Sequence, residues 1–371
     1  MSELKLTTDR HSFDDLRQTY NNFHSPALEI LVGGKKLISQ VGVAITKATI
    51  NSSLEGKADT FSFSVTNAFD TAAWEFRWVD DYLVPGNEIE IQLGYGTELS
   101  SLFYGHITAV SFSCEETPTI TVKGMDKSFL LMVDNKSTAW NKKKYSDVVK
   151  ELGQKYGLST HVDDTVQTIE TITKTVSETD FQFINRLAKI CNYDFFIVGK
   201  NLYFRKPLSN MTPVLTLIWG VSLRSFSVDV NIASQASSYT VRWVDKDKTT
   251  VLQEAKATSA DIGKLGTNSK TSADLLRAIG DYFDKYESTK KLDSPEEIKA
   301  VAKARLNQLA MNLLDGNCEA IGLPEIRAGR YITLEGMGKK LSQPYYITSV
   351  THTIDVASGY VTTFQVKGNT I

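Results

Sequence analysis

Residues that could carry out catalysis or bind a cofactor form no familiar motif in this sequence of 371 residues. A phosphate-binding GxxxxGKS/T loop, a GxSxG nucleophile elbow and an HExxH zinc motif do not occur. Gly94-Tyr95-Gly96 and Gly336-Met337-Gly338 begin a dinucleotide-type GxGxxG but lack its third glycine. Both end strand-like stretches, so we interpret them as turn glycines. We therefore predict no catalytic, cofactor-binding or metal-binding residue.

Histidines, cysteines and acidic pairs were the remaining candidates for chemistry. The five histidines are scattered, and the three cysteines lack C-x-x-C spacing, which argues against a zinc site and a disulfide framework. Glycoside hydrolysis needs only two carboxyl groups at a suitable separation, so adjacent acids keep that alternative open. They are Asp80-Asp81, Glu115-Glu116 and Asp163-Asp164. Neighbouring strand residues point to opposite faces, so no pair is favoured, and an assembly role is the better hypothesis.

The composition is that of a globular chain with no electrostatic preference for nucleic acid. Hydrophobic residues make up 42%, charged residues 23%, and the formal net charge is −2. This balance gives no basic surface for sequence-specific nucleic-acid binding or for an anionic membrane. No apolar run is long enough for a membrane span, and the N-terminus lacks a signal-peptide pattern. We expect a polypeptide made in the cytoplasm.

A helix followed by a hairpin forms the centre of the predicted organisation. Ser177 with Asp180 is a helix-start signal of the capping-box type, and the apolar residues that follow recur at helical spacing. Residues 193–198 and 202–205 then predict a hairpin with a turn at 199–201. An earlier helix is predicted over 145–156, with a glycine just past its end. Together these elements predict a central α+β module over residues 136–207.

Alternating apolar and polar residues predict antiparallel strands on both sides of this module. The expected strands are 27–32, 41–50, 60–65, 88–93, 101–113 and 119–122 before it, and 214–218, 223–230 and 239–244 after it. A polar, lysine-rich insert follows over 245–293, with a helix expected over 273–286. Ser294-Pro295 then starts a further helix that we expect to end at Asp315-Gly316.

Three sequence blocks repeat in the same order in the two β regions. PGNEIEIQLGYG, GHITAVSF and PTITVKG stand before the module, and AGRYITLEGMG, YYITSVTH and VTTFQVKG stand after it. The repeat glycines are Gly86, Gly105 and Gly124 in the first region, and Gly329 and Gly368 in the second. The repeat predicts two similar antiparallel β-barrels.

We expect the following domain organisation. Residues 1–24 form an N-terminal arm that is either a short helix or a segment reaching a neighbour. The first barrel spans 25–135, and the second spans 208–371 with a polar and helical insert over 245–315. Three such chains around a threefold axis would present six nearly equivalent barrels in a ring, and cyclic homo-oligomers are common.

The central helix and the repeat together resemble the phage late control protein D family, the baseplate hub proteins of contractile tails. Relatives include the hub of T-even phages and the N-terminal part of type VI secretion spike proteins. The family helix reads roughly E-S-D-x-x-F-x-x-R-L-A and stands here over residues 178–188 as ETDFQFINRLA. The motif residues are Glu178, Asp180, Phe181, Arg186 and Leu187. Further matches are Pro85-Gly86, Phe103-Tyr104-Gly105, Gly322-Leu323-Pro324, Gly329 and His352.

The resemblance implies a structural, non-enzymatic homotrimer that adapts the sixfold tail tube to a threefold central spike. Its implied partners are a separate spike protein, the tail tube protein, baseplate wedge proteins and, as a further candidate, the tape measure protein. The implied location is the baseplate of a virion or tail-like particle assembled in the bacterial cytoplasm. The alternatives are a tail-associated peptidoglycan-hydrolysing or cell-wall-binding protein, and the hub of a non-contractile tail.

Overall fold

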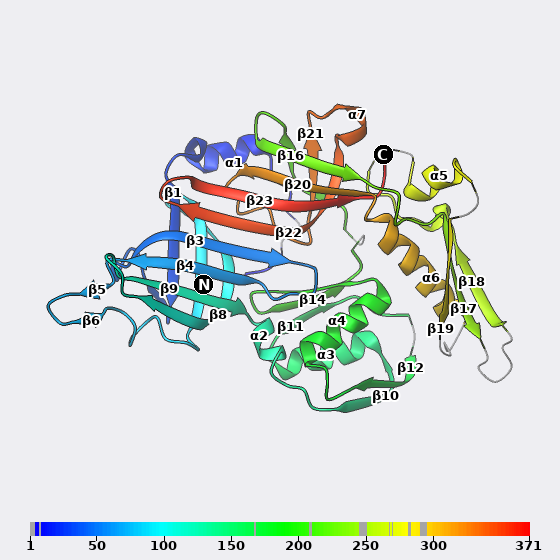
Figure 1. Ribbon diagram of the computed structural model, residues 1–371, viewed down its shortest axis with the longest axis horizontal. Helices are drawn as coiled ribbons and strands as arrows, with labels where there is room; N and C mark the ends of the chain where they lie inside the picture. The colour runs from blue at the N-terminus through cyan, green and yellow to red at the C-terminus, as the bar shows by residue number, and fades with distance from the viewer. Residues whose placement is uncertain are drawn as a thin grey trace.

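The computed structural model describes residues 4–6, 9–166, 168–207, 210–244, 251–266, 268, 270–280, 283–289 and 295–371. A 13-stranded sheet runs through the molecule (Figure 1). Its main path, in spatial order, is β16 (Leu223–Val230), β20 (Leu314–Ile321), β23 (Gly359–Gly368), β22 (Gln343–Asp355), β3 (Ala44–Ser53), β4 (Thr60–Thr66), β9 (Thr119–Asp126), β8 (Glu98–Ser113), β7 (Glu88–Tyr95), β1 (Pro26–Val32) and β2 (Lys35–Lys36). Off this path, β21 (Tyr331–Glu335) pairs with β22, and β15 (Pro213–Ile218) pairs with β21.

Alternation explains why these segments are strands. In β4, Phe61, Phe63 and Val65 point into the core, and the residues between them are partly exposed. Such a period of two buries one face of a strand. The strands expected in the first β region are all present, and the mainly β fold class with antiparallel sheets is confirmed.

The two β halves have the same strand order. The first runs β3-β4-β9-β8-β7-β1 and the second runs β16-β20-β23-β22-β21-β15. Thr108 and Thr348 are the extra residues of equivalent bulges in β8 and β22. Gly86 N donates to Ile107 O at 2.8 Å, and the equivalent bond from Gly329 N to residue 347 O is 2.9 Å. One difference remains, because β1 is antiparallel to β7 whereas β15 is parallel to β21.

The ladder registers correct one detail of the sequence repeat. Ile107 faces Gly124 across the β8–β9 ladder, whereas Ile347 faces Val366 across the β22–β23 ladder. The counterpart of Gly124 is therefore Val366, and matching it with Gly368 was wrong by two residues. A shift of two residues leaves every side chain on the same face, so alternation in the sequence cannot detect it.

The central module contains the predicted helices and hairpin. Its elements are β10 (Thr138–Lys144), α3 (Tyr145–Lys155), β11 (Ser159–Val162), β12 (Thr168–Lys174), α4 (Asp180–Cys191), β13 (Asp194–Val198) and β14 (Asn201–Arg205). The short helix α2 (Ser128–Leu131) precedes the expected start at 136, and its Leu131 lies in the same buried cluster. The start of α4 differs from the prediction. Thr179 is the N-cap and forms a reciprocal capping box with Gln182, whereas Ser177 lies outside the helix. Thr179 has Gln182 three residues later, which satisfies two backbone donors at once.

A separate α/β layer occupies much of the expected insert. It contains β17 (Ser238–Val244), β18 (Val251–Ala257), β19 (Asp284–Thr289), α5 (Ser272–Arg277) and α6 (Pro295–Ala310). Residues 238–244 therefore belong to this layer and not to the second β half. The helix predicted over 273–286 ends at Arg277, and 284–289 is a strand parallel to β17. Residues 245–250 and 290–294, including the expected helix-start Ser294, lie outside the described residues.

The expected end of α6 at Asp315-Gly316 was also wrong, because α6 ends at Ala310. Leu314 begins β20 and pairs with Gly368 of β23, and both residues are buried. Tertiary pairing therefore outweighs the helical periodicity that continues to Leu313.

The N-terminal segment forms both a strap and a helix. Asn201 Nδ2 donates to Leu4 O at 3.0 Å, and the Tyr203 hydroxyl accepts from Leu6 N at 3.1 Å, so the strap begins on the module hairpin. His11 N then bonds to β15, after which α1 (Phe13–Thr19) and the 3-10 turn η1 (Asn21–Phe23) precede β1. Within the described parts of the chain, no helix has the length and apolar character needed to cross a membrane.

Candidate functional site

The joint between the two β halves is made by β3 and β22. These strands pair antiparallel from Ser349 opposite Ser53 to Asp355 opposite Lys47. The side chains that face inward here are almost fully buried: Ala48, Ile50, Val350 and His352 are each at most 2% exposed. At the exposed face, Thr351 Oγ1 donates to Asn51 Oδ1 at 2.8 Å. The joint thus makes β16-β20-β23-β22-β3-β4-β9-β8 one continuous row of strands (Figure 1).

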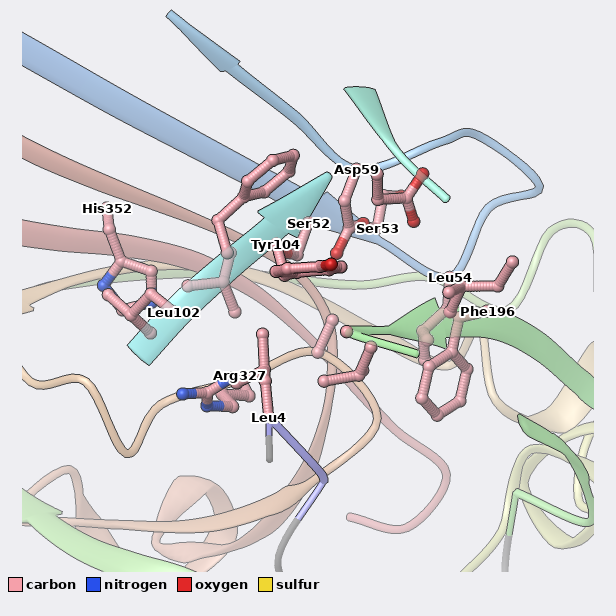
Figure 2. A pocket seen from close by; sticks show the side chains of 17 residues that line it. Leu4, Ser52, Ser53, Leu54, Asp59, Leu102, Tyr104, Phe196, Arg327 and His352 are labelled. Carbon is pink, nitrogen blue, oxygen red and sulfur yellow. The ribbon is translucent and has the colours of Figure 1, made fainter. Parts of the chain in front are cut away.

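A small cavity lies where this joint meets the module hairpin and the N-terminal strap. Figure 2 shows Arg327 and His352 from the second half, Asp59 from the first half, Phe196 from the module and Leu4 from the strap around it. Its volume is about 30 Å3. That is enough for about one water molecule and far too little for a sugar ring.

Two carboxyl groups beside this cavity have perturbed pKa values. Desolvation by the surrounding protein raises the pKa of Asp59 to about 7, against hydrogen bonds from Ser52 and from Ser53 N at 3.1 Å. The pKa of Asp126 is also raised, first by burial and then by the negative charge of Asp59. Both the backbone N and the hydroxyl of Ser128 donate to Asp126 at 3.1 Å. Perturbed acids are typical of active sites, but this cavity leaves no room for a substrate.

Arg327 and His352 supply the second-half side of the cavity. Burial lowers the pKa of Arg327, whose guanidinium donates to Ser101 O. His352 Nε2 is 3.0 Å from Ile326 O, and its Nδ1 lies 2.9 Å from the Tyr360 hydroxyl. Burial lowers the pKa of His352 to about 3, so the ring is neutral at pH 7, donating from Nε2 and accepting at Nδ1. These contacts make His352 a structural histidine at the joint.

The aspartate of the family motif forms a charged network inside the module. Asp180 accepts from Lys174 Nζ, from Lys155 Nζ at 2.8 Å and from the Tyr156 hydroxyl at 2.6 Å. Burial alone would raise the pKa of Asp180, but these hydrogen bonds outweigh it and lower the pKa. Lys155 also reaches Asp134 at 2.6 Å. The network ties the start of α4 to the ends of α3 and β12.

The other motif residues serve the same packing. Glu178 accepts two hydrogen bonds from Arg186, at 2.6 and 3.0 Å, and Arg186 also donates to Thr173 O at 2.9 Å. Phe181 is buried with its ring centroid 5.2 Å from that of Phe195, and Leu187 is fully buried. Four of the five motif residues therefore lie on α4, and Glu178 lies just before its N-cap, where all five hold the start of this helix against the elements around it.

The repeat glycines lie at tight turns and close strand crossings. Gly86 and Gly329 have φ values of +99° and +81°, a region that L side chains rarely adopt. A Cβ on Gly105 would lie 2.1 Å from Met125 O, and one on Gly124 would lie 2.1 Å from His106 O. A Cβ on Gly368 would lie 3.0 Å from a Leu314 methyl group. These positions are spread over both halves and form no common site.

The acidic pairs considered for hydrolysis are not brought together. Asp80-Asp81 and Glu115-Glu116 are exposed on the first half, and Asp163-Asp164 lies on the module. Asp164 pairs with Lys150 at 2.9 Å, and Asp163 accepts from a backbone amide at 2.9 Å. Among the described residues, no group of three or more His, Cys, Asp or Glu side chains is arranged to hold a metal ion.

Sequence reasoning missed the acids and the arginine at the joint. Asp59 and Arg327 lie in loops, 268 positions apart, and no spacing rule connects them. Asp126 follows two residues after the repeated block VKG, so the end of that block was the one available signal. His352, Phe103 and Tyr104, which also line the cavity, belong to the motifs that carry the resemblance.

The family model described as the Alg8 N-terminal domain matches residues 26–355. No curated protein sequence matches the chain.

Solved structures share the fold over nearly the whole chain. The 43 kDa tail protein of prophage MuSo2 from Shewanella oneidensis is 18% identical with a TM-score of 0.68, covering 92% of this chain and 98% of that one. The tail protein from Neisseria meningitidis MC58 is 14% identical with a TM-score of 0.64, covering 93% and 97%. An Escherichia coli component of the type VI secretion system, described as structurally similar to the T4 tail proteins gp27 and gp5, is 10% identical with a TM-score of 0.55, covering 92% and 77%. At the level of the fold, these structures confirm the resemblance to baseplate hub proteins.

Proposed function

We propose that this chain, which belongs to the family of the Alg8 N-terminal domain, is a structural baseplate hub protein, because it has the fold of phage tail proteins. In this proposal, three copies form a ring of six nearly equivalent β halves. The ring joins a hexameric tail tube to a trimeric central spike. Its role is passive, because it holds the tube and spike in register.

One observation carries this proposal, namely that the two β halves have the same strand order and are joined edge to edge. A chain that presents the same unit twice can meet a sixfold partner with three copies. The proposed units are 25–135 and 208–371, the second interrupted by the α/β layer described above, with the module 136–207 between them. The motif residues Glu178, Asp180, Phe181, Arg186 and Leu187 serve as the scaffold of that module, and the repeat glycines serve as turn and packing positions.

The partners follow from the proposed geometry. A central spike protein binds one end of the ring and the tail tube protein binds the other, with baseplate wedge proteins outside. The tape measure protein is a further candidate for the lumen. The location is the baseplate of a contractile phage tail or tail-like particle, assembled in the bacterial cytoplasm, with the hub of a non-contractile tail as the alternative.

We propose that the protein is not an enzyme. The two acids with raised pKa values face a cavity of about 30 Å3, which no polysaccharide can enter. A turbidity assay on purified cell walls tests this. Clearing that disappears on mutation of a single acid would replace the structural proposal with wall hydrolysis.

The decisive measurement is the native mass of the purified chain by light scattering, alone and with the spike protein encoded beside it. The proposal expects three copies in at least one of these samples. A dimer, a tetramer or a monomer that ignores the spike protein would overturn it.

A further inference from the structure

The eight-stranded row described above ends in two strand edges that have no partner among the described residues. At one end, β16 pairs with β20, and its only other pairing among the described residues is a single bridge from Leu223 to Trp219. At the other end, β8 pairs with β7 up to His106, and beyond the bulge its segment 109–113 pairs only with β9. These two edges lie on opposite sides of the sheet in Figure 1.

The internal repeat makes these edges equivalent to the two strands of the intrachain joint. Both β3 and β16 contain one bulge, at Thr46 and at Arg224, and matching the two bulges gives the equivalent positions of the two strands. The same equivalent positions follow from the pairing of β3 with β4 and β9, compared with that of β16 with β20 and β23. The bulges at Thr108 and Thr348 align β8 with β22. Within the chain, β3 pairs with the part of β22 that follows its bulge. The free strand β16 therefore corresponds to β3, and segment 109–113 of β8 corresponds to the part of β22 that pairs with β3.

Burial supports this correspondence. Val350 and His352 are almost fully buried at the joint, whereas their counterparts Val110 and Phe112 are partly exposed, with Phe112 at 51%. On the other strand, Ala48 and Ile50 are likewise buried, at 1% exposure each. Their counterparts on β16, residues 226 and 228, are only partly buried. Both edges thus keep apolar side chains at the positions that the joint covers.

We propose that β16 of one copy pairs antiparallel with segment 109–113 of β8 in the next copy, which repeats the β3–β22 joint between chains. This inference rests on the proposed ring and specifies its interface. The expected register places Ser111 opposite Asp229 and Phe112 opposite Val228. A head-to-tail contact of this kind uses two different surfaces and closes when the rotation per subunit is a simple fraction of a turn. Pairing also covers exposed strand edges that would otherwise promote aggregation.

Disulfide cross-linking tests the register. Ser111→Cys with Asp229→Cys corresponds to Thr351 and Asn51, whose side chains contact each other across the joint. The background carries Cys114→Ser and Cys191→Ser, which leaves Cys318 buried. Under mild oxidation of the assembled protein, alone or with the spike protein, we expect covalent trimers on non-reducing gels.

Two controls make the outcome unambiguous. Asn51→Cys with Thr351→Cys reports oxidation within a chain, which we expect to appear as a monomer with altered mobility. Ser111→Cys with Ser225→Cys shifts the expected register by four residues, about 13 Å along the strand, and should not cross-link. A trimeric mass with the intrachain bond formed but no 111–229 bond would overturn the proposed interface and leave the ring intact. A mass other than a trimer would overturn the ring, and this interface with it.

Discussion

At one equivalent pair of positions, the two β halves place the large and the small residue on opposite strands. In the first half, Phe61 lies opposite Gly124, and in the second half the equivalent positions hold Gly316 and Val366. A Cβ on Gly124 would lie 2.3 Å from the Phe61 ring, and one on Gly316 would lie 3.2 Å from a Val366 methyl group. Each large side chain therefore faces a glycine. Close packing constrains the total volume of a pair more strongly than the identity of either residue.

The halves also differ at the end that meets the module. The first half places Asp59 beside Asp126, and the equivalent positions of the second half are Leu314 and Gly368, which pair in the β20–β23 ladder. An apolar contact has thus been replaced by two carboxyl groups on one side only. What the halves share is the backbone, including the bulges in β8 and β22, and not the chemistry of their ends.

Deleting the bulge residue of β22 should have the largest effect on stability, and deleting the equivalent residue of β8 should have a smaller one. Deletion of Thr348 forces β22 to change register, which would turn Val350 and His352 away from the core. Because that part of β22 pairs with both β23 and β3, we expect a loss of more than about 4 kcal/mol in the free energy of unfolding, or no folded protein. Deletion of Thr108 changes a segment that pairs only with β9, so we expect a smaller loss. Soluble yield and urea denaturation compare the two deletions.

Equal losses from the two deletions would mean that the bulge is needed for each half alone and that the joint adds little. Thr348→Ala is the matched control, because it keeps the extra residue and removes only a side chain whose hydroxyl contact is long, at 3.5 Å.

Replacing Asp59 with asparagine removes a carboxyl group that the second half lacks at the equivalent position. Its folded pKa of about 7 lies above the ordinary value of an unfolded aspartate, so the folded state prefers the protonated form. Protonated Asp59 therefore contributes fully to the stability of the folded wild type below about pH 4. This contribution to the free energy of unfolding is lost as pH rises toward 7, by at most about 1.4 kcal/mol per pH unit. We expect the stability of Asp59→Asn relative to wild type to increase over that window and to be constant above it.

Urea midpoints measured from pH 4 to 8 on both proteins give this difference. Titrating groups far from Asp59 cancel in the comparison, whereas Asp126 contributes to it, because the charge of Asp59 raises the pKa of Asp126. A difference that does not change with pH would show that Asp59 titrates normally. Asp355→Asn, at the partly exposed end of β22 and at the far end of the joint, is the control for loss of a carboxyl group.

Much of the first half and the module could be predicted from the sequence, for local physical reasons. The strand alternation, the glycine after α3 and the turn at Gly199 each depend on neighbouring residues only. The repeat was visible because the blocks around Gly86 and Gly329 need the same backbone conformation. Local signals of this kind survive in the sequence whatever the strands later pair with.

The remainder depends on contacts between distant residues. Nothing in the sequence of β17 shows that it pairs with residues 251–257 and 284–289 and not with the second half. The end of α6 is set by the pairing of Leu314 with Gly368, and the alignment of Gly124 by a register that alternation cannot define. The acids at the joint could not be found, because their pKa shifts arise from burial by three separate regions.

Positions 352 and 112 are equivalent in the two halves. Exchanging their residues should affect the strand edge covered by the joint and the free edge of β8 differently. His352→Phe leaves Ile326 O, the Tyr360 hydroxyl and the Thr362 hydroxyl without their partner in a buried place, so we expect a loss of about 3 kcal/mol. Phe112→His changes a side chain that is 51% exposed and whose ring lies 5.0 Å from that of Phe76, so the stability of the monomer should fall by only about 1 kcal/mol.

Phe112→His should instead weaken assembly, because Phe112 lies in the proposed contact between copies. Sedimentation over a range of concentrations measures this, with Val356→Ser as an exposed control at the other end of the sheet. Unchanged assembly of Phe112→His would argue that the edge of β8 stays free in the ring.

Alanine at the two turn glycines gives the smallest effect and the closest comparison. Both Gly86 and Gly329 have positive φ, so each substitution should cost about 1–2 kcal/mol through backbone strain alone. A Cβ at Gly86 meets nothing within 4 Å, whereas one at Gly329 would lie 3.0 Å from the Arg205 guanidinium and 3.1 Å from the Phe196 ring. Arg205 also donates to Gly329 O, so Gly329→Ala should disturb the attachment of the module hairpin.

We therefore expect Gly329→Ala to lower the urea midpoint more than Gly86→Ala, and limited proteolysis to cut the module faster only in the Gly329 variant. Equal midpoints with equal cleavage would mean that the hairpin adapts to the added methyl group, and that the turn geometry shared by the two halves accounts for the whole cost. A larger loss at Gly86 would contradict the comparison, since open space surrounds its Cβ position and only the shared backbone strain can act there.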